Sequence, residues 1–152
     1  MKALLQRVSR ASVSIHGSCI GSIDSGILAL VGFGRNDSEE DLKWMARKNR
    51  ELRMFPDENG NMNLSLVDTH GKLLVVSQFT LHADTRKGRR PSFLRAADPE
   101  KAELLYMLFV EICSQGGVAV EQGRFGEMME VELLNDGPVT LMIDSPSERN
   151  MD

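Results

Sequence analysis

The chain has 152 residues, with 18 Lys and Arg against 22 Asp and Glu, which leaves a formal net charge of −4. Hydrophobic residues at 41% and charged residues at 26% are typical of a folded soluble domain and exclude collagen-like, coiled-coil and disordered chains. No apolar run approaches the roughly 18 residues that span a membrane, and a chain of this length folds around one core. We therefore expect one domain over residues 1–145, followed by a polar, frayed tail over 146–152.

The N-terminus and the cysteines predict a cytoplasmic protein. Polar residues follow the apolar residues 3–5 at once, which is too soon for the apolar segment of a secretory signal. Cys19 and Cys113 lie far apart, and neither has a second cysteine nearby to form a metal site or a redox pair. Both are expected to be reduced, buried thiols.

The first third of the chain is predicted to form strands. Residues 4–15 alternate apolar with polar, but the apolar parity changes midway, so one long strand with a bulge near Ser9-Arg10 would keep a single buried face. Residues 19–23 and 27–32, separated by a short turn with a glycine, predict a hairpin. The apolar second arm is typical of a strand covered on both faces.

Two helices and a central strand follow. One helix is expected to begin at Ser38 with a capping box, and the clearest helix begins at Asp98-Pro99 and ends at Gly116-Gly117. Between them, the strand 73–80 starts apolar and ends polar, and the cationic loop 82–95 is long enough to suspect a function. Three more strands are predicted over 118–122, 129–134 and 139–143, with a turn at 135–138.

Two clusters of cations stand out on this acidic chain. The first has four cations in five residues: Arg86, Lys87, Arg89 and Arg90. The second lies between Lys43 and Arg53. A pI of 5.4 argues against a protein that binds nucleic acid with its whole surface. The clusters fit a local contact with a polyanion and, equally, a solvated loop and a solvated helix face.

Thr80 and His82 are candidates for catalysis from their spacing. They would share one face if the strand continued, and a threonine beside a histidine can act as nucleophile and base. A polar strand end without a catalytic role explains the same residues, because no acidic partner can be named. No spacing of His, Cys, Asp or Glu predicts a metal site, and no glycine-rich loop predicts a nucleotide site. We expect neither a metal nor another cofactor.

Two segments carry a family resemblance. Ser-Gln-Phe-Thr-Leu at 77–81 and Asn-Asp-Gly-Pro-Val-Thr at 135–140 resemble the two signature motifs of the D-aminoacyl-tRNA deacylases, which hydrolyse D-amino acids from mischarged tRNA. Similar stretches occur at 6–8, 87–93 and 123–126, so the resemblance covers residues 1–145. It implies a mixed α/β single domain, with two packed β-sheets and helices on one outer face, that forms a homodimer.

The resemblance also implies a catalytic segment formed by Ser77, Gln78, Phe79 and Thr80. Main-chain N–H groups around Phe79 and Thr80 would bind the carbonyl oxygen, and the terminal ribose 2′-hydroxyl of the tRNA would assist. This mechanism suits an aminoacyl ester, which is already activated and needs a placed water or hydroxyl more than a strong nucleophile. A nucleophilic Thr80 is the rival mechanism.

Chiral selection is implied for Gly137-Pro138, in the cis form and inserted from the partner subunit. A rigid gate of this kind selects by penalising the wrong arrangement at the α-carbon. From the residues alone, this segment fits a plain hairpin turn. The resemblance further places Arg7 as a brace for this segment, and Phe125 and Met129 in the pocket for the terminal adenosine.

The expected partner is the aminoacylated acceptor end of tRNA, contacted by Arg86, Lys87, Arg89 and Arg90 with help from 43–53, and neither DNA nor a membrane is expected. The expected reaction is hydrolysis of D-aminoacyl-tRNA, extended to glycyl-tRNA mischarged on tRNA-Ala because glycine has no side chain to meet the gate. A non-catalytic RNA-binding module and a paralogue with relaxed chirality are the alternatives. The intact motif at 77–81 argues against the first, and the unaltered 135–140 disfavours the second.

Overall fold

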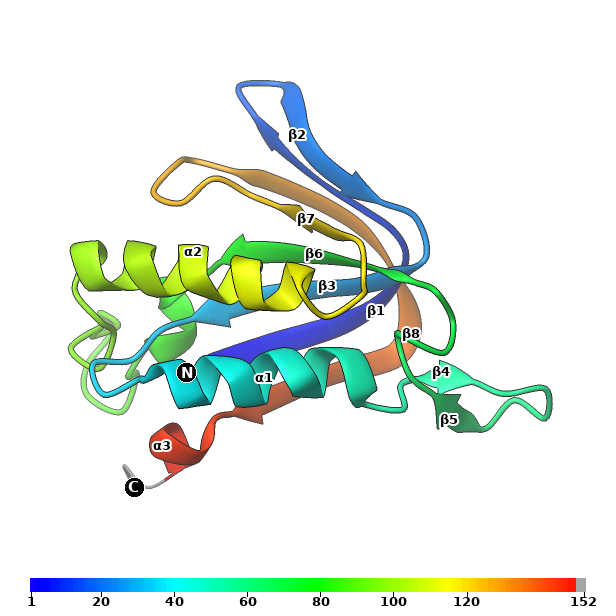
Figure 1. Ribbon diagram of the computed structural model, residues 1–152. Helices are drawn as coiled ribbons and strands as arrows, with labels where there is room; N and C mark the ends of the chain where they lie inside the picture. Colours follow the sequence, from blue (N-terminus) through cyan, green and yellow to red (C-terminus); the bar gives the residue numbers. More distant parts are fainter. Residues whose placement is uncertain (150–152) are drawn as a thin grey trace.

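The structure is a computed structural model that describes residues 1–149 as a mixed α/β domain (Figure 1). The strands are β1 (Lys2–Ile15), β2 (Ser18–Ile23), β3 (Gly26–Gly32), β4 (Phe55–Pro56), β5 (Met62–Leu64), β6 (Lys72–Ser77), β7 (Val120–Gln122) and β8 (Glu130–Asp144). The helices are α1 (Glu39–Glu51), α2 (Pro99–Ser114) and α3 (Pro146–Arg149), and η1 (Phe79–His82) is a 3-10 turn. Over this part of the chain, no helix is long and apolar enough to cross a membrane.

The long strand β1 organises the sheet. β8 runs antiparallel to β1 along most of its length, and β3 runs antiparallel to the first half of β1. β6 lies parallel to β3, and β7 lies parallel to β6. Within residues 1–149 these strands and β2 make one six-stranded sheet, and β4 and β5 form a separate two-stranded sheet. The mixed α/β prediction is confirmed.

The predicted hairpin between 19–23 and 27–32 is wrong. Both strands pair with β1 and lie end to end, because Ile23 is opposite Ala11 and Gly26 is opposite Val8. β1 has 14 residues, which is long enough to pair with both. The hairpin is instead formed by β1 and β2.

The two strands predicted at 129–134 and 139–143 are one strand, β8. Gln6 is opposite Thr140 and Val8 is opposite Asn135, so Arg7 alone on β1 faces residues 136–139 on β8. Residues 136–139 therefore form a large bulge within a strand, and the hairpin turn predicted at 135–138 is wrong. A second irregularity, between Val8 and Arg10, confirms the bulge that the apolar parity predicts.

The curved sheet makes two layers, and its strands contribute to two cores. Ile27, Ala29, Val31, Leu73 and Val75 pack against α1 and α2 in one core. The alternate residues Leu28, Leu74 and Val76 pack against the second half of β1, β2 and β8 in the other. β3 is thus covered on both faces, as predicted, and α1 and α2 lie side by side in front of the sheet (Figure 1).

The helix boundaries agree with the sequence patterns. Ser38 and Asp41 form the capping box of α1, and the Asp98 side chain accepts from the Lys101 N–H at 3.1 Å at the start of α2. The expected frayed tail is wrong for residues 146–149, which form α3 with Glu148 buried. Ser147 of this helix is hydrogen-bonded to Asp37 and Asp41, so the polar composition of the segment does not show that it is frayed. The remainder of that tail, 150–152, lies outside the described residues.

Candidate active site

The first motif lies where β6 ends. The Gln78 N–H donates to the Val31 carbonyl at 2.7 Å, and the chain then turns into η1 instead of continuing as a strand. Phe79 and Thr80 are the first residues of this turn, so their N–H groups have no acceptor inside it. Among the described residues, neither N–H group has an acceptor elsewhere. Two adjacent backbone donors are therefore available at the end of β6.

The candidate Thr80–His82 dyad is not formed, because the turn separates the two side chains. Thr80 is exposed, and its hydroxyl accepts a hydrogen bond from the Gln78 amide. His82 is only 2% exposed and approaches Glu148 instead. The two side chains point apart because residues 79–82 form a turn. The polar end of the predicted strand did not indicate this turn.

A cavity of about 1060 Å³ adjoins the first motif. It brings together Ser77, Gln78 and Phe79 with Phe125 and Met129. Further lining residues come from three other places: His16 and Gly17 of the β1–β2 turn, Ala97, Pro99 and Ala102 at the start of α2, and 126–131. The walls are mostly apolar, which suits a ligand with a flat apolar ring and a polar end. His16 is a lining residue that the sequence analysis did not select.

Tyr106 of α2 holds two walls of the cavity together. Its buried hydroxyl lies 3.0 Å from the Val75 carbonyl of β6 and 3.2 Å from the Gly123 carbonyl. Burial raises the pKa of Tyr106 well above its ordinary value, so the hydroxyl remains a donor. The Tyr106 ring also packs on Phe125, with centroids 5.9 Å apart. A Cβ at Gly123 would lie 2.7 Å from Met129 Sδ, so glycine allows that close approach.

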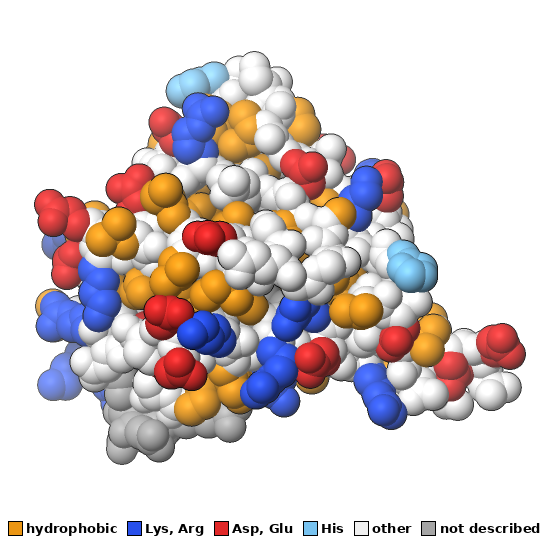
Figure 2. All heavy atoms as spheres, viewed as in Figure 1, with side chains coloured by type: hydrophobic (Ala, Val, Ile, Leu, Met, Phe, Trp, Pro, Cys, Tyr) orange, Lys and Arg blue, Asp and Glu red, His pale blue; other side chains and the backbone are white. Residues whose placement is uncertain are grey.

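The cationic loop is tethered to the first motif. The rings of Phe79 and Phe93 meet edge to face with centroids 5.1 Å apart, and Asp84 pairs with Ser92 across the loop. Hydrogen bonds from Arg86 hold the pKa of Asp84 well below its usual range. Lys and Arg side chains gather at the left edge in Figure 2, where this loop lies in Figure 1; Arg86, Lys87, Arg89 and Arg90 are exposed.

The second cationic cluster is engaged on α1. Lys43 pairs with Glu39 at 2.7 Å, and the Lys48 ammonium lies 5.3 Å from the centre of the Trp44 ring. Arg50 packs on Gly116, where a Cβ would lie 1.9 Å from its Nη1. These cations therefore contact neighbouring groups on the surface of the protein. None of the three is among the residues that line the cavity.

Arg7 is buried and braces the second motif. Its Nε lies 2.9 Å from Oδ2 of Asp136, and its Nη1 donates to the Met54 carbonyl at 2.6 Å. The Asn135 side-chain amide donates to the Arg7 carbonyl at 2.9 Å and to the Val139 carbonyl at 3.2 Å. These contacts fix both ends of the bulge. The Gly137–Pro138 bond within it is cis, and both residues are exposed.

The described chain does not bring the two motifs together. Arg7 is opposite Ile27 and Ile27 is opposite Leu73, whereas Ser77 lies four residues further along β6. At about 3.3 Å per residue, this is about 13 Å along the strands, in addition to the spacing between them. Accordingly, Gly137 and Pro138 are absent from the described lining of the cavity.

The two cysteines of the chain differ in their exposure. Burial raises the pKa of Cys113 to about 12. Cys19 is exposed, so the prediction of two buried thiols is wrong for that residue, which lies on the edge strand β2. In residues 1–149, no group of three or more His, Cys, Asp or Glu side chains could hold a metal ion.

The family model described as D-Tyr-tRNA(Tyr) deacylase matches residues 4–144. The D-aminoacyl-tRNA deacylase of Thermosipho africanus is 52% identical over 145 residues, which are 95% of this chain and 97% of that protein. The D-aminoacyl-tRNA deacylase of Bacillus velezensis is 53% identical over 145 residues, which are 95% and 99% of the two chains.

Two solved structures share the fold. The protein named c-Myc DNA Unwinding Element Binding Protein superposes with a TM-score of 0.91 and 41% identity, covering 96% of this chain and 99% of that one. A probable eukaryotic D-amino acid tRNA deacylase gives a TM-score of 0.79 over 93% of this chain and 97% of that one. Its identity is 17%, so it supports the fold alone.

Proposed function

Because the chain belongs to the D-Tyr-tRNA(Tyr) deacylase family, we propose that it hydrolyses the ester bond between a D-amino acid and the 3′-terminal adenosine of tRNA. The products are free tRNA and the D-amino acid, so the reaction is a chiral proofreading step in translation. The observation that carries the proposal is the cavity beside Phe79. Residues of the first motif line it together with Phe125 and Met129.

The mechanism rests on the backbone of the turn. The available N–H groups of Phe79 and Thr80 bind the carbonyl oxygen and stabilise the negative charge that develops on it. The terminal ribose 2′-hydroxyl, held close to the ester, assists the attack of water. Ser77 and Gln78 shape the turn, and the Gln78 amide donates a hydrogen bond to the Thr80 hydroxyl. A nucleophile from the protein is not required.

The adenosine is bound by the apolar part of the cavity. Phe125 and Met129 line it, and the Tyr106 hydroxyl fixes the loop that carries Phe125 relative to β6. An aromatic ring and a thioether suit the faces of a purine ring. This leaves the aminoacyl group close to the η1 turn.

Chiral selection is assigned to Gly137 and Pro138 of the partner subunit in a homodimer. Within one chain these residues are too far from Ser77 to line its cavity, so a second copy must supply them. Among the described strands β8 pairs with β1 alone, so its other edge is open to a second copy. Leu134, Leu141 and Met142 on this strand are apolar side chains that are 49%, 38% and 55% exposed, which supports such an assembly. The gate excludes an L side chain, and glycine passes because it has none. Glycyl-tRNA mischarged on tRNA-Ala is therefore a second substrate.

The tRNA acceptor end is held by phosphate contacts from Arg86, Lys87, Arg89 and Arg90. The Phe79–Phe93 contact places this loop beside the motif that contacts the ester. Such contacts position a nucleic acid without reading its sequence. The substrate is cytoplasmic tRNA, and duplex DNA is not a partner.

Release of free tRNA from matched D- and L-tyrosyl-tRNA tests this function. We expect hydrolysis of the D form and of glycyl-tRNA-Ala, with little hydrolysis of the L form. Equal hydrolysis of both tyrosyl forms would indicate the relaxed paralogue. Binding without hydrolysis would indicate an RNA-binding module, and duplex DNA in the same binding assay tests the partner.

Gly137→Ala tests the gate without disturbing the fold of one chain. A Cβ at Gly137 meets a single neighbour, Asn135 Oδ1 at 3.5 Å, so the variant has room to fold. We expect it to lower activity on D-tyrosyl-tRNA more than Thr80→Ala does. A Gly137→Ala chain with wild-type rate and selectivity would remove this segment from the site.

A further inference from the structure

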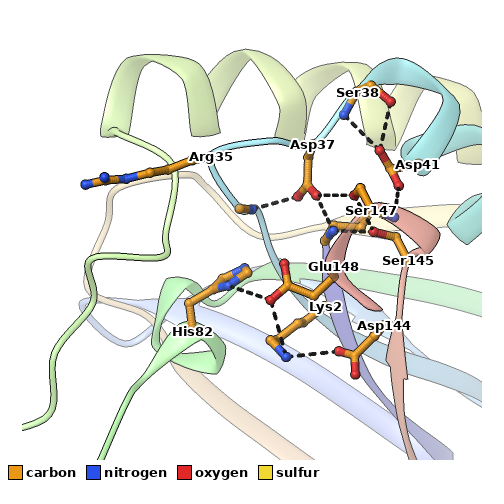
Figure 3. Close-up of polar contacts among 12 residues, drawn as sticks. Lys2, Arg35, Asp37, Ser38, Asp41, His82, Asp144, Ser145, Ser147 and Glu148 are labelled. Carbon is orange, nitrogen blue, oxygen red and sulfur yellow. Dashed lines mark hydrogen bonds and ion pairs between the residues drawn. The ribbon is translucent and has the colours of Figure 1, made fainter. Parts of the chain in front are cut away.

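The C-terminal helix α3 is tied to the body of the protein by buried polar groups (Figure 3). The N-terminal ammonium group of Met1 donates to Asp37 and to Ser145. Ser147 donates its N–H to Asp41 at 3.1 Å and its hydroxyl to Asp37 at 3.2 Å. α3 is therefore held through Ser145, which precedes it, and through Ser147 within it.

His82 joins this helix to the candidate active site. It is the last residue of η1, and its Nδ1 lies 3.7 Å from Oε1 of Glu148, with both side chains buried. The same Glu148 oxygen lies 3.5 Å from Nζ of Lys2, and Figure 3 shows His82 and Lys2 converging on it. The His82–Glu148 separation is longer than a hydrogen bond. Neither ring nitrogen of His82 has a hydrogen-bond partner among the described residues.

The end of β3 is shaped around this pair. A Cβ at Gly32 would lie 3.1 Å from His82 Cδ2 and 2.8 Å from the Gln78 carbonyl oxygen. A Cβ at Gly34 would lie 3.0 Å from Glu148 Oε2 and 3.3 Å from His82 Cε1. Two glycines thus leave room for the imidazole and the carboxylate together, and a side chain at either position would crowd the His82 ring.

We infer that His82 and Glu148 are positioning residues, which fix the η1 turn so that its first two N–H groups meet the substrate carbonyl oxygen. This inference rests on the proposed function. The turn transmits position because it is short and bonded at both ends: Leu81 N–H donates to Gln78 at 3.2 Å and Ala83 N–H donates to Thr80 at 3.0 Å. A misplacement of about 1 Å can cost on the order of 100-fold in rate.

Burial makes the neutral form of the His82 ring the favoured one, and the charges around the ring act on its pKa in both directions. The groups that face it are Glu148 on α3, Lys2 on β1, the Met1 ammonium group just before β1, and Asp37 after β3. Burial lowers the pKa of His82, and the Gly32 carbonyl and the Glu148 carboxylate partly oppose this. Protonation would draw the ring toward Glu148 and move the turn with it. Loss of the Glu148 charge would lower the pKa of His82 further.

The test compares Glu148→Gln and His82→Asn with the wild-type chain. His70→Asn is the matched control, because His70 is exposed and has a positive φ of 53°, which asparagine tolerates. Single-turnover rates on D-tyrosyl-tRNA are measured between about pH 5 and pH 8, with the KM for tRNA and the thermal midpoint of each variant. NMR titration of the His82 ring gives its pKa independently of activity.

We expect both site variants to lower the rate on the order of tenfold while KM changes less than about twofold, as a shift in oxyanion donors requires. The acid limb of the rate profile should move to lower pH in Glu148→Gln, together with the NMR pKa of His82, and disappear in His82→Asn. A purely structural role would lower the thermal midpoint and leave the limb in place.

The outcomes separate this inference from the proposed function. A wild-type chain that does not hydrolyse D-tyrosyl-tRNA would overturn both. An active wild-type chain with wild-type rates and an unmoved acid limb in Glu148→Gln would overturn the inference alone. If His82→Asn does not fold, Glu148→Gln decides, because it keeps the shape of the side chain.

Discussion

Nε of Arg7 lies 2.9 Å from Oδ2 of Asp136, the residue that precedes Gly137. Arg7 is 8% exposed, and its guanidinium group also donates to the Met54 carbonyl. A single side chain on β1 thereby connects the bulge of β8 with the segment that follows α1. Together with the Asn135 amide, this side chain holds residues 136–139 opposite Arg7.

Arg7→Lys should destabilise the protein and disorder the bulge, because an ammonium group cannot reach both partners with the planar geometry of a guanidinium. We expect the free energy of unfolding in urea to fall by about 1–3 kcal/mol, the cost of leaving a buried polar partner unpaired. Activity on D-tyrosyl-tRNA should fall with it. Arg10→Lys is the control, since Arg10 is exposed and lies 3.8 Å from Glu132; equal effects at both positions would contradict the brace.

Thr80→Ala should keep substantial deacylase activity. The hydroxyl is exposed and accepts from Gln78, whereas the proposed donors belong to the backbone. Single-turnover hydrolysis of D-tyrosyl-tRNA measures the effect, and we expect a loss of less than about tenfold. A loss near the 10⁴-fold typical of removing a true nucleophile would restore the Thr80 mechanism.

Neutralising Lys87, Arg89 and Arg90 should weaken the binding of every tRNA alike. Each lost phosphate contact should reduce the slope of log affinity against log salt by about 0.7–0.9. Arg86→Gln should have a smaller effect, because Asp84 already offsets the charge of Arg86 at 2.7 Å. The control is Lys43→Gln on α1, and an unchanged slope in the triple variant would mean that these charges only solubilise the loop.

Tyr106→Phe should loosen the cavity without removing an apolar contact. The variant loses the hydroxyl between the Val75 and Gly123 carbonyls, which should cost about 0.5–1.5 kcal/mol of stability. Because this contact fixes the loop to Phe125, KM for aminoacyl-tRNA should rise more than the single-turnover rate falls. A change in stability without any change in KM would show that the cavity does not depend on this contact.

Stability should decline in two stages as the pH falls. The pKa of His82 is lowered in the folded state, so below about pH 6.5, the ordinary value for histidine, the unfolded chain binds more protons and folding weakens. Burial would raise the pKa of Asp41, but hydrogen bonds from Ser38 and Ser147 hold it far below its usual value. The stability that the ionised Asp41 gives to the folded state should therefore be lost only as the pH falls below the ordinary pKa of aspartate, about 3.9. Urea unfolding as a function of pH should lose the first stage in His82→Asn, and the second stage should become smaller in Asp41→Asn.

Local patterns in the sequence predict much of this protein, because they record contacts between near neighbours. The capping residues Ser38 and Asp98 predict the starts of α1 and α2, and the apolar parity of residues 4–15 predicts the β1 bulge. The cationic loop and the two motifs are also visible in the sequence. Each of these signals depends on residues a few positions apart.

The tertiary structure alone decides features whose partners are distant in the sequence. β2 and β3 are collinear because both pair with β1. Residues 136–139 form a bulge because β8 pairs with β1 on both sides of them. The turn at 79–82 sends Thr80 outward and His82 into the interior. Glu148 is buried because His82 and Lys2 lie beside it. A polar residue has no fixed preference until such partners surround it, so its burial cannot be predicted from its neighbours in the chain.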